Sequence, residues 1–139
     1  MPDRVEFAAL ADDLIRQVDG GLDDPEWVKK RYMKKMRDAD RTVYEVPFLT
    51  LQKGPVRLCL DPTGYDVPGA EAAVDLYLMP TYDPLATFYS EGGRWFIHSD
   101  FLPGPKDEGS AEEGRRAPLA HDTLNQVMEA IAEHAVPSL

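Results

Sequence analysis

Hydrophobic residues recur at helical spacing near both ends of the chain. Over residues 4–19 they return every three or four positions, which is typical of one face of a helix. Asp3 and Glu6 form a variant of the capping box at its start, and Gly20-Gly21 favours its end. A second apolar face over residues 119–136, stopped by Pro137, predicts a C-terminal helix.

A helical pattern also runs through residues 24–40. Asp24 suits an N-cap, and Pro25 suits the first helical position. Basic residues then follow at i, i+4, i+7 and i+11, so a helix would place them in one narrow row. The row consists of Lys30, Lys34, Arg37 and Arg41. We therefore predict a second N-terminal helix that carries a cationic row.

Between these helices the period of the pattern changes to two. Alternation predicts strands at 43–51, 56–60 and 74–78, with Pro47 breaking the first strand or pushing it to a sheet edge. Residues 85–100 predict a hairpin around Gly92-Gly93, because glycine tolerates positive φ at both central positions of a tight turn. That turn sets the pairs Thr87–His98, Phe88–Ile97, Tyr89–Phe96 and Ser90–Trp95, and it places Trp95 in the core.

Together these elements predict an α+β fold with two N-terminal helices, a four- to five-stranded and mainly antiparallel sheet, and a C-terminal helix. We expect residues 1–139 to form a single domain. Residues 61–71 hold too much proline and glycine for regular structure, and the polar segment 103–118 is expected to be a mobile loop.

The predicted sheet has one apolar face and one mixed face. Alternation sends Val56, Leu58 and Leu60 to the core, whereas their neighbours point to the other side. The mixed face is too aromatic for plain solvent exposure and too polar for a core, which favours contact with a ligand, with a partner or with the long loops of the chain itself. Its candidate contact residues are Arg57, Tyr77, Tyr89, Phe96, His98 and Asp100.

Catalysis has weak support. His98 and Asp100 lie two residues apart, and a carboxylate near an imidazole can orient it as a base. However, the chain has no nucleophile elbow of the G-x-S-x-G type and no cysteine–histidine signature. We therefore predict no catalytic residue and a non-enzymatic protein. The alternative is a small-molecule-binding cup or a minor enzyme that uses His98, Asp100 and Tyr77.

Charge is unevenly distributed. The chain carries a net charge of −10, yet residues 29–41 hold seven basic and two acidic residues, a local +5 against −15 elsewhere. The overall charge disfavours nucleic acid, because phosphate contacts need a cationic surface. The row of Lys30, Lys34, Arg37 and Arg41 instead predicts docking of an acidic segment, either of a protein partner or of residues 107–113 of the chain itself.

Other classes of protein lack support in the sequence. No apolar stretch approaches the roughly 20 residues of a membrane span, and the N-terminal residues do not form a secretory signal, so we expect a cytoplasmic protein with no membrane partner. The single cysteine, the missing Walker A loop and the missing EF-hand spacing predict no metal and no cofactor. The function we expect is a protein-binding or adaptor role, with self-association through the mixed sheet face.

Overall fold

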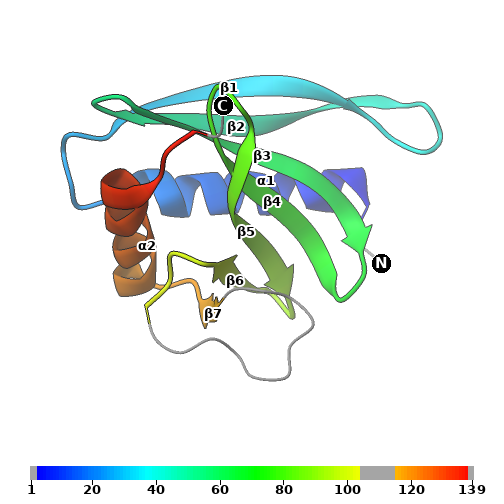
Figure 1. The fold of residues 1–139 in the computed structure, drawn as a ribbon. Helices are drawn as coiled ribbons and strands as arrows, with labels where there is room; N and C mark the ends of the chain where they lie inside the picture. The colour runs from blue at the N-terminus through cyan, green and yellow to red at the C-terminus, as the bar shows by residue number, and fades with distance from the viewer. Residues whose placement is uncertain (1–2, 104–114, 138–139) are drawn as a thin grey trace.

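The chain folds as one seven-stranded sheet with a helix at either end of the sequence. The computed structural model describes residues 3–103 and 115–137, apart from the side chains of residues 66 and 67 (Figure 1). In chain order the elements are α1 (Arg4–Gly21), β1 (Val28–Arg37), β2 (Val43–Lys53), β3 (Val56–Val67), β4 (Ala70–Leu78), β5 (Asp83–Glu91), β6 (Arg94–Ser99), β7 (Arg115–Pro118) and α2 (His121–His134).

The strands lie in the sheet in the order of the sequence, and every neighbouring pair is antiparallel. Both helices pack on the same face, with α1 running along β1 and β2 in Figure 1. The core lies between the helices and this face. The predicted α+β class, the N-terminal helix and the C-terminal helix are therefore confirmed, whereas the predicted four to five strands are too few.

Helix α1 forms where its sequence pattern predicts it. The Asp3 carboxylate accepts a hydrogen bond from the Glu6 backbone N–H at 2.9 Å, which caps the first turn. Its buried side chains share one face, namely Phe7, Ala11, Leu14, Ile15 and Val18. The helix ends at Gly21, where a Cβ atom would lie only 2.9 Å from Leu124 Cδ2 of α2. Glycine at this position therefore lets the two helices approach closely.

The predicted second helix is wrong, because residues 28–37 form strand β1. Its ten residues pair with β2 from Val28 opposite Gln52 to Arg37 opposite Val43. Lysine, arginine and methionine favour helices locally, but the long ladder with β2 overrides that preference. Asp24 does not cap a helix either: its side chain accepts from the Glu26 N–H at 2.9 Å and closes a turn.

The sheet opens between β2 and β3. These strands pair only from Leu49 opposite Leu60 to Lys53 opposite Val56. Beyond that point Pro47 lies in a part of β2 whose one neighbour is β1, so its missing N–H breaks no ladder with β3. Phe7 of α1 fills the opening and contacts the rings of Tyr44 and Tyr65 at centroid distances of 6.4 Å and 5.5 Å.

Two segments expected to be irregular contain strands. Most of residues 61–71 belongs to β3 and β4, where a register shift between Pro62 and Gly64 absorbs the proline. Residues 115–118, the end of the predicted mobile loop, form β7 and pair with β6. Residues 104–114 of that loop lie outside the described part of the chain.

The predicted hairpin is confirmed in full. Gly92 and Gly93 both have positive φ, at 57° and 76°. Thr87, Phe88, Tyr89 and Ser90 pair with His98, Ile97, Phe96 and Trp95, as the turn requires. Trp95 is 6% exposed and belongs to the main core.

In the described chain, neither helix combines the length and the apolar character that crossing a membrane would require.

Candidate binding groove on the uncovered sheet face

The face of the sheet opposite the helices carries the residues predicted for the mixed face. Cys59 pairs with Tyr77, Asp75 with Thr87, and Thr87 with His98, so these side chains project from the same side. They are half-buried, unlike the fully buried leucines that alternate with them. In the described residues, no helix covers this face. We call it the uncovered face.

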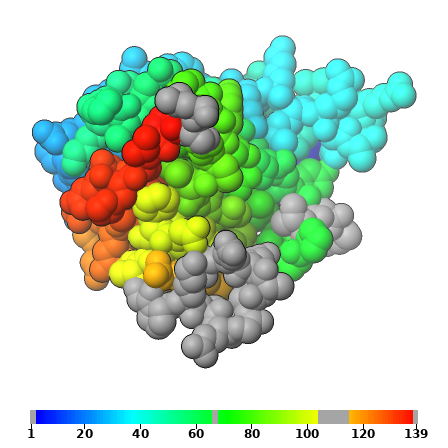
Figure 2. All heavy atoms as spheres, viewed as in Figure 1, coloured from blue at the N-terminus to red at the C-terminus, as the bar shows by residue number. Residues whose placement is uncertain are grey.

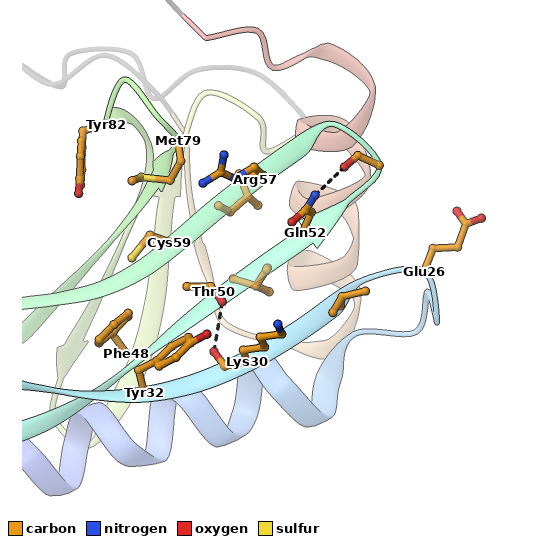
Figure 3. Close-up of a pocket in the computed structure, with 14 residues that line it drawn as sticks. Glu26, Lys30, Tyr32, Phe48, Thr50, Gln52, Arg57, Cys59, Met79 and Tyr82 are labelled. Atoms are coloured by element: carbon orange, nitrogen blue, oxygen red, sulfur yellow. Dashed lines mark hydrogen bonds between the residues drawn. The ribbon is translucent and has the colours of Figure 1, made fainter.

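A groove of about 760 Å³ lies on the uncovered face along β1, β2 and β3 (Figure 3). Alternation along these strands supplies its floor, and the turn after β4 supplies one end. Its chemistry combines aromatic rings, a thiol, a methionine and two cations. Its lining includes Lys30, Tyr32, Phe48, Arg57, Cys59 and Tyr82.

Lys30 and Arg57 give the groove its charge. The neighbouring cations are already engaged: Lys29 pairs with Asp19, Arg31 with Asp12, and Lys34 with Asp61. By contrast, no ion pair among the described residues involves Lys30 or Arg57. The acid on the rim, Glu26, points away from the other lining side chains in Figure 3 and lies 3.7 Å from Lys53.

Aromatic rings line the groove beside these cations. Tyr32 and Phe48 stack at a centroid distance of 5.3 Å and an interplanar angle of 21°. Tyr82, which is 60% exposed, meets the ring of Tyr77 edge to face at 5.9 Å. Flat rings next to unpaired cations can hold the apolar part of a ligand while the cations bind its acidic groups.

The Cys59 thiol lies on the groove floor. Burial raises its pKa, the nearby Asp61 carboxylate raises it further, and the Lys34 ammonium lowers it. The sulfur is therefore a neutral thiol at physiological pH rather than a reactive thiolate. This environment suits a binding surface better than nucleophilic catalysis.

A second hollow, of about 410 Å³, lies on the same face over β5, β6 and β7. Tyr89, His98 and Arg116 contribute to its lining. The Arg116 guanidinium lies over two stacked rings, 5.1 Å from the centroid of Tyr89 and 4.7 Å from that of Phe96. It also contacts Glu91 at 2.9 Å. The sequence pattern does not indicate Arg116 as a candidate, because it predicts a mobile loop where β7 forms.

Asp75 organises the polar centre of the uncovered face. It accepts hydrogen bonds from the Tyr77 hydroxyl at 3.1 Å and from the Thr87 hydroxyl at 2.8 Å. Burial and the Asp75 charge raise the pKa of Tyr77 to about 12, so the phenol stays protonated. Tyr77 therefore donates to a neighbouring carboxylate, and it supplies no base at neutral pH.

The remaining predicted site residues are dispersed. Arg57 lines the groove, whereas Tyr89 and His98 line the second hollow. Asp100 is exposed in the turn after β6, and its backbone carbonyl accepts from Arg115 at 2.9 Å. The sequence placed these residues on one face without showing that they belong to two separate hollows.

The predicted helical row of cations does not exist as one stripe. Because β1 is a strand, Lys30 and Lys34 lie on one side of it and Arg37 lies on the other. Arg41 lies in the turn after β1 with a φ of 69°. Lys30 instead lies in the groove that Arg57 also lines, a juxtaposition that a helix over residues 24–40 would have prevented.

The described side chains contain no group of three or more histidine, cysteine, aspartate or glutamate residues that could hold a metal ion. No protein-family model, curated protein or solved structure matches this chain. The chemistry of the groove is therefore the main evidence for the function of this protein.

Proposed function

We propose that this protein is a non-enzymatic binding protein that holds an acidic segment of a partner protein in the groove on its uncovered face. The observation that carries the proposal is the position of Lys30 and Arg57, which line a half-enclosed groove without an acidic partner among the described residues. In a chain with 25 acids and 15 bases, unpaired cations at one site favour an acidic occupant.

The groove also favours a polypeptide over a single charged group. Its rings and Met79 offer apolar contact along the same surface that offers two cations. A segment that presents acidic and apolar side chains to the same surface uses both. Hydrogen bonds between ionised partners each contribute about 1.5–3 kcal/mol, so two of them support specific capture.

A synthetic eight-residue peptide with the repeat Glu-Glu-Val-Val tests the proposal, because each face of this peptide in extended form carries both residue types. Its affinity is measured by fluorescence anisotropy, and its position by protection of Cys59 from a thiol reagent. Cys59 is the single cysteine of the chain, so protection reports on the groove floor directly. We expect binding that weakens as salt screens the charges.

The variant Lys30→Glu/Arg57→Glu should reduce peptide affinity at least about ten-fold through the loss of two charge-assisted contacts. The matched control is Arg16→Glu/Arg94→Glu, which changes the net charge equally at two exposed sites away from the groove lining. Equal loss in both variants would reduce the effect to overall charge and contradict a specific site. Peptide binding that leaves Cys59 fully reactive would also contradict it.

A small-molecule cup is the second candidate, and the hollow with His98 and Arg116 is the observation that favours it. The Arg116 guanidinium stacked on Tyr89 and Phe96 resembles a platform for a planar acid. A screen of aromatic carboxylic acids by chemical shifts of His98 would test it, with Arg116→Ala as the control. Shifts that persist unchanged in Arg116→Ala would contradict this second site.

Self-association through the uncovered face remains a further prediction. Arg116 covers part of the Tyr89 and Phe96 rings, so the exposed apolar area there is smaller than the sequence indicates. Tyr89→Glu should shift sedimentation toward monomer if the face pairs with a second copy. A wild-type protein that is monomeric across micromolar concentrations would contradict the prediction.

A further inference from the structure

Strand β1 forms one free edge of the sheet. It is ten residues long, whereas the opposite edge strand, β7, has four. Within the described chain, no strand pairs with the outer edge of β1. In an antiparallel edge strand, alternate residues direct their N–H and C=O groups outward, where another strand can bond to them. Figure 2 shows the end of the β1–β2 hairpin, in cyan, standing out from the rest of the molecule.

The charges on β1 decide what can pair with it. Six of its ten residues are lysine or arginine, and none is acidic. An antiparallel pair of β1 strands centred on Tyr32 and Met33 would place Lys30 opposite Lys35 and Arg31 opposite Lys34. Like charges directly opposite each other destabilise a sheet, so a second copy is a poor occupant. An acidic strand has the complementary charge.

We infer that the acidic segment binds by adding to β1 as an eighth strand, with its backbone bonded to the free edge and alternate side chains in the groove. The inference rests on the proposed function and specifies how the partner binds. The groove begins at this edge, since Val28, Lys30 and Tyr32 of β1 line it. A strand added here therefore lies beside the unpaired cation Lys30 and beside the stacked Tyr32 and Phe48 rings.

Strand addition also engages the opposite face of β1, which groove docking alone does not. Side chains of a strand alternate, so every second residue of the partner points to the side of β1 that faces away from the groove. There Lys35 and Arg37 are exposed and, among the described residues, take part in no ion pair. Acidic side chains on both faces of the partner strand thus have cations to meet.

Backbone methylation of the glutamate–valine peptide tests this mode of binding. One version is N-methylated at its odd positions and the other at its even positions, because these two sets of N–H groups point to opposite edges of a strand. We expect the unmodified peptide to bind and at least one methylated version to lose about ten-fold or more in affinity. Amide hydrogen exchange in β1 should slow when the unmodified peptide is bound.

A protein variant provides a second readout. Lys35→Glu/Arg37→Glu should weaken the peptide several-fold, whereas the matched control Arg41→Glu/Arg94→Glu should not. If both methylated peptides bind like the parent and still protect Cys59, strand addition is wrong and the groove proposal stands. If no peptide protects Cys59, the proposed function itself fails. Slow β1 exchange in a peptide-free dimer would assign the edge to a second copy and overturn the inference.

Discussion

Trp95→Ala removes the largest side chain of the β5–β6 hairpin from the core. Trp95 is 6% exposed, and its backbone carbonyl accepts from the Leu119 N–H at 2.9 Å. Its ring Nε1–H also donates to the exposed Asp13 carboxylate of α1 at 3.3 Å. The backbone of the residue joins the hairpin to the segment before α2, and its side chain reaches α1. Truncation keeps the backbone bond but removes the side-chain contacts, so it should destabilise the fold.

The expected loss follows from burial. A large aromatic side chain truncated to alanine in a core costs about 3–5 kcal/mol, which combines lost transfer free energy with the cavity left behind. The long hydrogen bond to an exposed carboxylate adds at most about 1 kcal/mol. Against a total stability of roughly 5–15 kcal/mol, the variant should lose at least about a fifth of its free energy of unfolding.

Urea denaturation followed by circular dichroism measures this loss, with the slope of the transition checked for two-state behaviour. Trp95→Phe keeps most of the apolar contact and should lose under about 1.5 kcal/mol. Arg94→Ala, one residue earlier and exposed, should change stability by less than about 0.5 kcal/mol. A loss below about 1 kcal/mol for Trp95→Ala would refute the position of Trp95 in the core.

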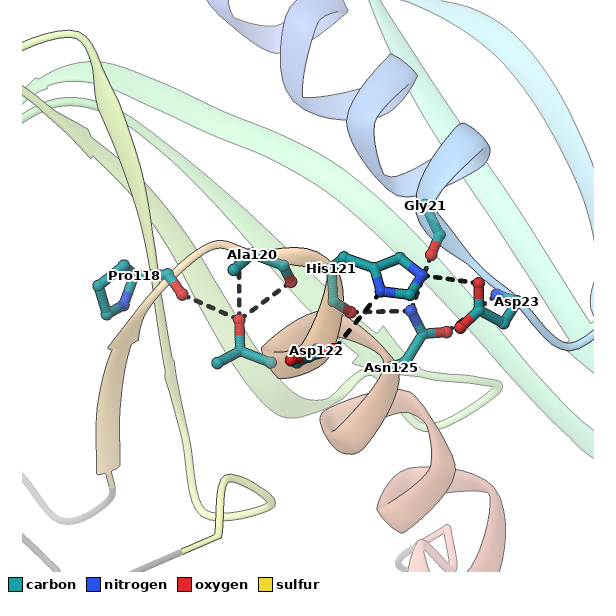
Figure 4. A network of polar contacts seen from close by, with 8 residues as sticks. Gly21, Asp23, Pro118, Ala120, His121, Asp122 and Asn125 are labelled. Atoms are coloured by element: carbon teal, nitrogen blue, oxygen red, sulfur yellow. Dashed lines mark hydrogen bonds and ion pairs between the residues drawn. The ribbon is translucent and has the colours of Figure 1, made fainter.

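Three further predictions concern single side chains. Ser90 is fully buried and its hydroxyl has no hydrogen-bond partner in the described structure, so Ser90→Ala should raise the free energy of unfolding by about 1 kcal/mol. The control Ser99→Ala should lower it by about 1 kcal/mol or more, because Ser99 donates to the Leu85 carbonyl at 2.7 Å; a loss in both would contradict the reasoning. The His121 ring forms a hydrogen bond with the Asp23 carboxylate at 2.7 Å, and Figure 4 shows this contact between α2 and the segment after α1. This hydrogen bond is the main reason that the pKa of His121 lies above 6.5. Its stabilising effect is complete below pH 6.5 and is lost as pH rises through the raised pKa. Asp23→Asn should return the value toward 6.5 in an NMR titration, and an unchanged value would count against the contact. Cys59 should react with a thiol reagent at neutral pH far more slowly in the folded chain than in urea, since its pKa is raised by burial; equal rates would show an open sulfur.

Sequence patterns predicted the elements whose local chemistry agrees with their tertiary surroundings. Gly92-Gly93 imposes one hairpin register, and the alternation of Phe88 with its neighbours agrees with it. The apolar face of α1 and its Asp3 cap likewise point to one structure. In these segments, local preference and packing select the same conformation.

Sequence reasoning failed where a distant partner decides the conformation. Residues 28–37 favour a helix by composition, but their ladder with β2 depends on the turn at Asp38–Thr42, whose bonds a linear pattern does not reveal. Pro62 suggested a loop because the opening beside β3, which tolerates proline, arises only in the assembled sheet. The groove could not be predicted for the same reason, since Lys30 and Arg57 line one surface only once β1, β2 and β3 have paired.

The order of the strands has a consequence for synthesis of the chain on the ribosome. Each strand pairs with the one made just before it, so the sheet can grow hairpin by hairpin as it emerges. Its helix-covered face is not closed until α2 arrives, because Leu124, Val127, Met128 and Ile131 complete the core from the last element. A nascent chain stalled before residue 121 therefore exposes part of that apolar face, which makes it a substrate for chaperones until α2 is added.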